Sequence, residues 1–345
     1  MERLLSEITE QPTVLQRLLD LEYPTICEIA ATVRRREIRW VLIAGRGTSD
    51  NAATYAKYLF GAVNRLPVAL AAPSLYTTYS TPPRLQNALV LAISQSGMSP
   101  DIVAVVEDAR AQGMSTVAIT NAADSRLGQA VEHIILCRAG EEQSIAATKT
   151  YTAELLALAM LSVALAGDKG RLDHLRALPE ALSAILAVRD QVLQRAERYR
   201  YMDDCAVIGR GYNYATASEL ALKLTELAYV GANPYSSADF MHGPVAAIGP
   251  GFPVFLIAPT GRTYPELEQL AEELRQLQAE LVVISDREEL LAVAQSPLRL
   301  PVSVDEWLSP ITAIVPGQLF GYALARAKGL DPDHPRGLRK VTETL

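Results

Sequence analysis

The sequence predicts an α/β protein built from two tandem, doubly wound parallel-sheet domains. Short, continuous apolar runs such as WVLIAG, ALVLAIS, STVAIT and HIILC alternate with helical patterns, of which DIVAVVEDARAQG is an example. Runs of this kind are typical of strands buried on both faces of a parallel sheet. Their alternation with helices favours a layered α/β fold, in which ligands bind beyond the carboxyl ends of the strands.

An internal repeat is the second observation. Two Gly-Arg-Gly motifs follow apolar runs and begin 164 residues apart, at Gly45 and Gly209. The next apolar runs lead to SQSG and APTG, which end at Gly97 and Gly261, again 164 apart. A third pair, STVAITN and LVVISD, repeats at an offset of 165. Three strand-to-loop junctions in the same order indicate a duplicated domain.

The remaining elements are arranged around this pair. Two helices joined near AGDKGR are expected to close the first half, and a polar tail ends the chain. The predicted organisation is a helical segment (1–38), a first domain (39–165), a helical connector (166–200), a second domain (201–328) and a C-terminal tail (329–345).

Composition and charge exclude several classes of function. Hydrophobic residues make up 49% of the chain and charged residues 21%, as in ordinary soluble proteins. The net charge of −7 argues against nucleic acid as the main partner, because general nucleic-acid binders are basic. The start MERLLSEITEQP lacks the apolar core of a signal peptide, and no apolar run reaches the ~20 residues that span a bilayer. We therefore expect a cytoplasmic protein without a membrane partner.

Cysteine and histidine show no metal-binding pattern. Cys27, Cys137 and Cys205 are scattered, and we expect them to be buried free thiols in a reducing compartment. The four histidines also lack ligand spacing. The sequence therefore predicts a protein without a metal or another cofactor.

The stretch AISQSGMSPD leaves a strand and begins a helix. Ser99 can cap this helix, since a proline follows at its first position. A helix N-terminus offers unpaired N–H groups and a partial positive charge, which favour a phosphate. Ser94, Gln95 and Ser96 add neutral donors, and Gly97 lets the backbone approach the ligand. This predicts a phosphate-binding loop; the alternative is an ordinary capped turn.

A second donor loop, GRGTSDN, follows the first strand and contributes Gly47, Thr48 and Ser49. In the second half, the loop that matches SQSG is APTG, which has lost both serines. Only the first half keeps these donors, as expected if one of two related sites still binds phosphate.

Several motifs occur in one order along the chain: GRGTS, SQSG, AATKTYTAE, GRG followed by ASELALKLTE, HGP and PRGLRK. Together they resemble the sugar isomerase (SIS) family over nearly the whole chain. The likeness is closest to the isomerase half of glucosamine-6-phosphate synthase and its stand-alone relatives, which include phosphosugar isomerases and SIS-type glucosamine-6-phosphate deaminases. The resemblance implies flavodoxin-like domains and a hexose 6-phosphate as substrate.

The resemblance also implies the phosphate ligands, because the family binds phosphate through its SQSG and GTS loops. The implied residues are Ser94, Gln95, Ser96 and Ser99, with Ser49 assisting beside Thr48 and Gly47. Two positions depart from the synthases: Met98 replaces a usual acidic residue and Ala147 a usual serine. The synthase substrate pocket is therefore not reproduced in full.

The synthases begin with a glutaminase domain, whereas this sequence begins Met-Glu-Arg and has no room for one. We therefore expect that the chain does not use glutamine on its own.

SELALKLTELAY is predicted to form a helix after the second GRG, with Glu219, Lys223 and Glu226 on one face. The ordinary explanation is a solvated Glu–Lys pair. Apolar neighbours favour a buried helix instead, in which carboxylates need partners and mark functional sites. The resemblance implies that Glu226 moves a proton between carbons 1 and 2 of the open-chain sugar. It implies that Glu219 and Lys223 orient the pocket and that Lys223 offsets enolate charge.

His242 lies in the motif HGP, and Lys340 in the tail motif PRGLRK. A lone histidine is more often structural, and a tail lysine is normally solvated. The resemblance implies that His242 assists ring opening and reaches the active site of a neighbouring subunit, which requires a homodimer. It implies that Lys340 forms an imine with the open-chain ketose.

The leading expectation is an aldose–ketose isomerase that acts on an amino-sugar phosphate, with deamination of glucosamine 6-phosphate to fructose 6-phosphate and ammonia as its concrete form. One alternative is an isomerase or deglycase for another 6-phosphosugar conjugate. The other is a non-catalytic sugar-phosphate sensor, which the retention of Glu226, His242 and Lys340 disfavours.

Overall fold

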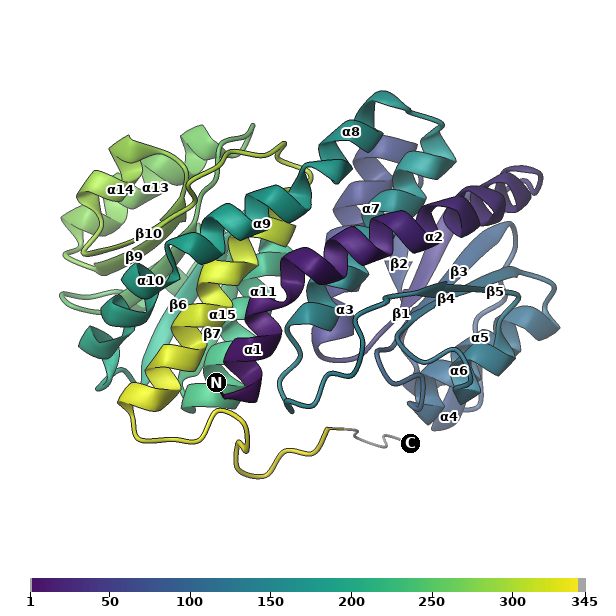
Figure 1. Ribbon diagram of the computed structural model, residues 1–345, viewed down its shortest axis with the longest axis horizontal. Coiled ribbons are helices and arrows are strands. Elements are labelled where there is room, and N and C mark those ends of the chain that lie inside the picture. Colours follow the sequence, from purple (N-terminus) through teal and green to yellow (C-terminus); the bar gives the residue numbers. More distant parts are fainter. Residues whose placement is uncertain (1, 341–345) are drawn as a thin grey trace. The chain divides into compact units, whose positions relative to one another are not determined.

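A computed structural model describes residues 2–340 and contains two parallel five-stranded sheets flanked by helices, which confirms the predicted fold class (Figure 1). The chain divides into two compact units, each named here by its sheet. The first-sheet unit holds residues 13–142, 149–176 and 339–340, and the second-sheet unit holds residues 2–12, 143–148 and 177–338.

The first sheet has the strand order β2-β1-β3-β4-β5, and all neighbours are parallel. Every residue of β3 and β4 is buried, as continuous apolar runs predict. The edge strand β2 was not predicted, because it has three residues and lies partly exposed. The strands are β1 (Trp40–Ala44), β2 (Val68–Leu70), β3 (Ala88–Ile93), β4 (Ser115–Thr120) and β5 (His133–Leu136).

Helices cover both faces of the first sheet. On one face, α5 and α6 bury an apolar cluster against alternate residues of β1, β3 and β4; α3 and α7 pack together and contact the strands from the other face (Figure 1). The elements are α2 (Gln11–Arg34), α3 (Thr48–Leu59), a π-helical turn (Phe60–Asn64), α4 (Ser74–Thr77), α5 (Pro100–Ala111), α6 (Arg126–Ala130), α7 (Lys149–Ala166) and α8 (Gly170–Arg176).

The second sheet repeats the order of the first, as β10-β9-β8-β6-β7. The repeated glycines also act alike: a Cβ at Gly45 would lie 2.8 Å from the carbonyl oxygen of Ser49, and one at Gly209 would lie 2.2 Å from that of Asn213. Each glycine thus lets a strand end approach the first turn of the next helix. The strands are β6 (Asp204–Gly209), β7 (Gly231–Ser236), β8 (Pro253–Ile257), β9 (Glu280–Ser285) and β10 (Ser296–Arg299).

The helices of the second-sheet unit also form two layers. α12, α13 and α14 share an apolar cluster with β6, β8 and β9, and α11 packs with α15 on the other face. α1, α9 and α10 pack on α15. The elements are α1 (Arg3–Thr9), α9 (Leu178–Ala187), α10 (Arg189–Ala196), a 3-10 turn (Glu197–Tyr199), α11 (Asn213–Ala228), α12 (Ser237–Met241), a 3-10 turn (Pro244–Ala247), α13 (Tyr264–Gln276), α14 (Glu288–Val293) and α15 (Ser309–Ala327).

The region from 150 to 200 differs from the two predicted helices. α7 ends at AGDKGR as expected, but three helices follow, α8, α9 and α10. α9 carries Pro179 in its first turn, where the missing N–H costs nothing, so this proline begins a new helix rather than continuing the old one. α7 is long and apolar enough to cross a membrane by length and composition, yet 89% of it is buried inside the structure, as in a core helix.

Candidate functional site

The strand order puts the two predicted phosphate loops side by side. In this topology the strand order reverses at β1, because β2 lies on one side of β1 and β3 on the other. Ligands bind at such a switch point, beyond the carboxyl ends of the strands. GRGTS follows β1 and SQSG follows β3, and these two strands pair in register from Trp40–Ala88 to Ala44–Ala92. The fold therefore places both donor loops where it ordinarily binds a ligand.

The SQSG loop is held by its own hydrogen bonds. Ser94 Oγ accepts the Gly97 N–H at 3.2 Å, and Ser96 Oγ accepts the Met98 N–H at 3.3 Å. The Gln95 carbonyl accepts the Asn121 N–H at 3.0 Å. Because each serine oxygen serves as an acceptor in these bonds, its hydroxyl hydrogen can still be donated to a ligand.

Gly97 is required by this geometry. Its φ is +63°, and an added Cβ would lie 2.1 Å from Ser125 Oγ. Ser125 caps α6, where its hydroxyl oxygen accepts the Gly128 N–H at 3.2 Å. A side chain at position 97 would therefore disturb both the loop and the start of α6.

Ser99 precedes α5 at the N-cap position, as predicted, but its side chain makes no capping hydrogen bond. Asp101, buried in the first turn of α5, pairs with Arg46 of the other loop, with Nε and Oδ2 2.8 Å apart. This ion pair ties GRGTS to the start of α5. Neither partner was predicted, since an exposed arginine between glycines and an acidic residue in a helix's first turn are both common.

Gly47 precedes α3 with a φ of +53°, and Thr48 is the first residue of that helix. Ser49 is buried and donates its hydroxyl hydrogen to Glu154 Oε1 of α7 at 2.9 Å. In this arrangement Ser49 fixes the loop to α7. Glu154 was missed, although an acidic residue within the apolar run of α7 is the same signal that pointed to Glu219.

The equivalent loop in the second-sheet unit shows what such a helix start can bind. Thr263 precedes α13 as Ser99 precedes α5. Its N–H and its hydroxyl both donate to Glu306 Oε1, at 3.2 and 3.0 Å. A Cβ added at Gly261 would lie 2.5 Å from the Glu306 carboxyl carbon. A carboxylate of the chain itself is thus bound at the position that matches the predicted phosphate site.

α11 carries the predicted acid–base residues, and its buried face confirms that this helix is not solvated. Glu219 and Lys223 are fully buried, and the exposed fraction of the Glu226 side chain is 22%. Lys223 Nζ lies 3.5 Å from Glu219 Oε1 and 2.5 Å from Glu226 Oε2. The lysine therefore compensates both carboxylates, and Glu226 alone of the three reaches solvent appreciably.

His242 follows α12 in a turn, where its N–H donates to the Asp239 carbonyl at 3.1 Å, and its side chain is exposed. The tail passes the end of α11: Arg336 stacks over the Tyr229 ring at 4.2 Å, and its N–H donates to Tyr229 Oη at 2.7 Å. Tyr229 immediately follows the helix that carries Glu226.

Lys340 ends the described chain and belongs to the first-sheet unit, where its Nζ lies 3.0 Å from Glu142 Oε2. Glu142 was not predicted. The phosphate-loop residues therefore share a unit with Lys340, while Glu219, Lys223, Glu226 and His242 belong to the other unit.

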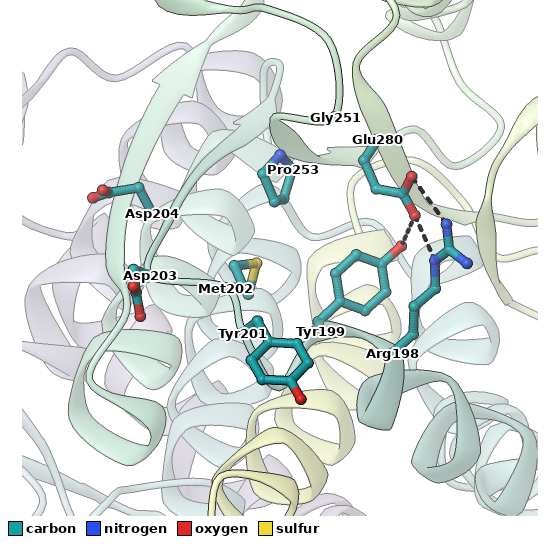
Figure 2. Close-up of a pocket in the computed structure, with 9 residues that line it drawn as sticks. All are labelled: Arg198, Tyr199, Tyr201, Met202, Asp203, Asp204, Gly251, Pro253 and Glu280. Atoms are coloured by element: carbon teal, nitrogen blue, oxygen red, sulfur yellow. Dashed lines mark hydrogen bonds and ion pairs between the residues drawn. The ribbon is translucent and has the colours of Figure 1, made fainter.

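A cavity of about 480 Å³ lies at the amino edge of the second sheet, where β6, β8 and β9 begin (Figure 2). Arg198 and Tyr199 both bond to the Glu280 carboxylate there, which satisfies those groups internally. Its lining contains none of the predicted site residues.

Within residues 2–340, no group of three or more His, Cys, Asp or Glu side chains could hold a metal ion. Cys137 and Cys205 are buried, whereas Cys27 is partly exposed, contrary to expectation.

Known proteins resemble this chain over almost its full length. Glutamine–fructose-6-phosphate aminotransferase (isomerizing) of Bordetella parapertussis is 37% identical over 349 residues, 97% of this chain. The enzyme of that name from Pyrococcus horikoshii is 36% identical over 346 residues, 98% of this chain. The chain spans 57% of the length of each.

Solved structures are also similar to this chain over almost its full length. A candidate phosphosugar isomerase from Silicibacter pomeroyi has a TM-score of 0.87 and 35% identity, covering 96% of this chain and 100% of that one. Glucosamine-6-phosphate deaminase from Thermotoga maritima shares the fold, with a TM-score of 0.79 and 24% identity over 99% of this chain and 100% of its own. The sequence pattern of the SIS domain matches residues 36–164 and 203–326, one match in each half of the repeat. The chain therefore belongs to the SIS domain family.

Proposed function

We propose that this chain is a phosphosugar isomerase that deaminates an amino-sugar 6-phosphate, converting glucosamine 6-phosphate and water to fructose 6-phosphate and ammonia. The observation that carries the proposal is a duplicated site, called here the anion cradle: the loop and helix start at Ser99 before α5, and its copy at Thr263 before α13. In one copy the helix-start donors hold the Glu306 carboxylate, while in the other copy Ser99 makes no capping bond and SQSG adds two hydroxyl donors.

The phosphate binds first in this proposal. The hydroxyls of Ser94 and Ser96, the Gln95 amide and the start of α5 donate to its oxygens, with Thr48 and the backbone at Gly47 in the neighbouring loop. The partial positive charge at the N-terminus of α5 favours the dianion. Arg46 and Asp101 keep the two loops together while the ligand enters and leaves.

The proton transfer is assigned to Glu226. After ring opening assisted by His242, Glu226 removes the proton from carbon 2 and returns it to carbon 1, leaving a protonated imine at carbon 2. Lys223, 2.5 Å from Glu226, supplies positive charge when the enolamine forms, and Glu219 holds the lysine in place. The Lys340 amine then attacks carbon 2, ammonia leaves, and water hydrolyses the new imine to release the ketose.

The test is ammonia release from glucosamine 6-phosphate alone, without glutamine. Equal amounts of ammonia and fructose 6-phosphate are expected from the wild type, and neither from Lys340→Ala. Binding of the sugar phosphate without turnover would instead indicate a sensor. Absence of both binding and turnover would contradict the proposed substrate.

A second candidate uses the same phosphate site for another 6-phosphosugar conjugate. Met98, whose exposed fraction is 41%, presents an apolar group beside the SQSG loop where the synthases carry an acidic residue. Methionine carries no charge at this position, so the substrate pocket differs here from that of the synthases. Turnover of a glycated amine 6-phosphate in preference to glucosamine 6-phosphate would select this alternative.

We also propose a homodimer located in the cytoplasm, in which His242 serves the active site of the partner. Its exposed position after α12 leaves it accessible to another subunit. Inactive His242→Ala and inactive Lys340→Ala proteins should regain activity when unfolded and refolded together, since a mixed dimer contains one complete site. Absence of recovery in a mixture that sediments as a dimer would place His242 in its own subunit's site.

A further inference from the structure

Glu142 is a buried carboxylate that the proposed reaction does not use. Its side chain has no exposed surface, yet it lies 3.0 Å from Nζ of Lys340, whose exposed fraction is 26%. The neighbouring Glu141 is exposed. A fully buried carboxylate requires compensation, because removing an ionised group from water is costly. The contacts of Glu142 therefore show what it is placed to do.

Two of these contacts come from the start of α7. Thr150 donates its hydroxyl to Glu142 Oε2 at 2.7 Å and its N–H to Glu142 Oε1 at 3.2 Å. Thr150 is the second residue of α7, where backbone N–H groups have no partner within the helix and a negative charge is favoured. These bonds hold both carboxylate oxygens in place independently of Lys340.

The segment that carries Glu142 is also joined to the SQSG loop. The Asn121 N–H donates to the Gln95 carbonyl at 3.0 Å. The Asn121 side chain accepts the Ala139 N–H at 3.0 Å and donates to the Gly140 carbonyl at 2.6 Å. A continuous series of hydrogen bonds within the first-sheet unit thus runs from the SQSG loop to the residues just before Glu142.

We propose that Glu142 is a positioning residue for Lys340: it sets the place of the lysine amine relative to the phosphate loop. The inference rests on the proposed function, in which Lys340 Nζ attacks carbon 2 of a sugar whose phosphate is held by SQSG. Attack requires the amine and the carbon to approach along a narrow path, and a shift of ~1 Å can reduce a rate about 100-fold. Glu142 holds Lys340 Nζ at the position from which this approach begins.

The experiment compares Glu142→Gln with Glu141→Gln, the same change one residue earlier on an exposed side chain. Fructose 6-phosphate is added to each protein with borohydride, which reduces the imine between Lys340 and carbon 2 to a stable secondary amine. Peptide mass spectrometry then measures the modified fraction of Lys340. For Glu142→Gln, we expect trapping and kcat to fall about 10- to 100-fold with little change in KM, since the phosphate loop is intact. Glu141→Gln should match the wild type.

A second readout does not depend on the reaction. Trypsin must take the Lys340 side chain into its own specificity pocket, so the contact with Glu142 should slow cleavage after Lys340. Glu142→Gln should therefore be cleaved at this position faster than Glu141→Gln. Protection of each variant against thermal unfolding by inorganic phosphate tests whether the fold and the loop are retained.

The possible outcomes distinguish the proposed function from the positioning role of Glu142. Failure of the wild type to trap fructose 6-phosphate on Lys340 would overturn the proposed function and this inference with it. Normal trapping and normal tail cleavage in Glu142→Gln would overturn the inference alone. Loss of phosphate protection in Glu142→Gln would also overturn it, because the residue would then support the fold rather than the lysine.

Discussion

Ser99 and Thr263 occupy the same position in two copies of one fold, each immediately before a helix and 164 residues apart. Thr263 donates its N–H and hydroxyl to the carboxylate of Glu306, whereas Ser99 makes no capping bond. The duplicated site thus has one copy closed by an internal anion. The copy that kept SQSG is the one we expect to bind the phosphate of a substrate.

Ser96→Ala should weaken substrate binding and leave turnover nearly unchanged. A hydrogen bond to a charged group contributes about 1.5–3 kcal/mol, so KM should rise about 10- to 100-fold. Thr260→Ala is the matched control, because 260 and 96 occupy equivalent loop positions and Thr260 holds Asp286 through its backbone N–H. Steady-state kinetics of both variants check this. An equal rise in KM for both would mean that the effect is not specific to the SQSG loop.

Glu226→Gln should lower kcat with little change in KM. General acid–base groups contribute about 100- to 10,000-fold to rate, and the amide cannot accept the sugar proton. Because Gln still accepts a hydrogen bond from Lys223, the helix should remain folded. Exchange of the carbon-1 proton with solvent deuterium, followed by NMR, measures the step directly. Exchange at the wild-type rate would remove Glu226 from this role.

Lys223→Met should destabilise the second-sheet unit. The substitution leaves the buried Glu219 without its cation, and breaking a buried ion pair in this way costs about 3–5 kcal/mol. The double variant Glu219→Gln/Lys223→Met should recover much of this loss, because no buried carboxylate is then left at position 219. Urea unfolding of the wild type, of Lys223→Met and Glu219→Gln singly, and of the double variant gives the comparison. Additive losses in the double variant would show that the two side chains do not stabilise each other.

Asp50→Asn should raise stability at neutral pH. Burial raises the pKa of Asp50 above its ordinary value, and the charge of Arg46 offsets only part of this. Between the unfolded and folded pKa values the native state binds more protons, so the free energy of unfolding falls as pH rises through that window. The wild type keeps this loss of stability at higher pH. The variant does not show it, because asparagine has no carboxyl group to ionise.

Urea unfolding between pH 4 and pH 8 checks this prediction. The stability advantage of Asp50→Asn should grow with pH and then level off. Asp124→Asn, a substitution on an exposed side chain of the same unit, should show no such growth. A constant advantage at every pH would assign the effect to helix propensity instead of charge.

Thiol reactivity should separate the three cysteines. Burial raises the pKa of Cys137 well above its ordinary value and that of Cys205 to about 12, and only thiolates react readily. At pH 8, the native protein should react with Ellman's reagent at Cys27 alone, and Cys27→Ser should remove that reaction. Denaturation should expose the other two thiols. Fast reaction of native Cys27→Ser would contradict the burial of Cys137 and Cys205.

Much of the fold could be predicted because strands buried on both faces leave a strong local pattern. The apolar runs at β1, β3, β4, β6, β8 and β9 were all recognised, and so was β5, an edge strand that still carries the apolar run HIIL. The strands that were missed, β2, β7 and β10, are edge strands of the two sheets. Edge strands are half-exposed and need no continuous apolar run, so GANPYS and SPLR carried no signal.

The residues of the candidate site also divide into those that a local sequence pattern reveals and those that it does not. Ser94, Ser96 and Ser99 were recognised from a loop at a strand end, and Glu219 and Lys223 from polar residues in an apolar helix. Glu142 and Asp101 were not, because their importance lies in partners 198 and 55 residues away in the chain, Lys340 and Arg46. No local pattern specifies such a pairing.

The sequence by itself determined that a strand–loop–helix unit is duplicated, which loops hold hydroxyl donors and which helix buries carboxylates, because these properties follow from neighbouring residues. Only the tertiary structure decided that Glu306 fills one copy of the anion cradle and that Lys340 meets Glu142. Both are contacts between distant segments, formed because parallel strands bring their carboxyl ends to one edge and because a buried charge must find its partner wherever the fold supplies one.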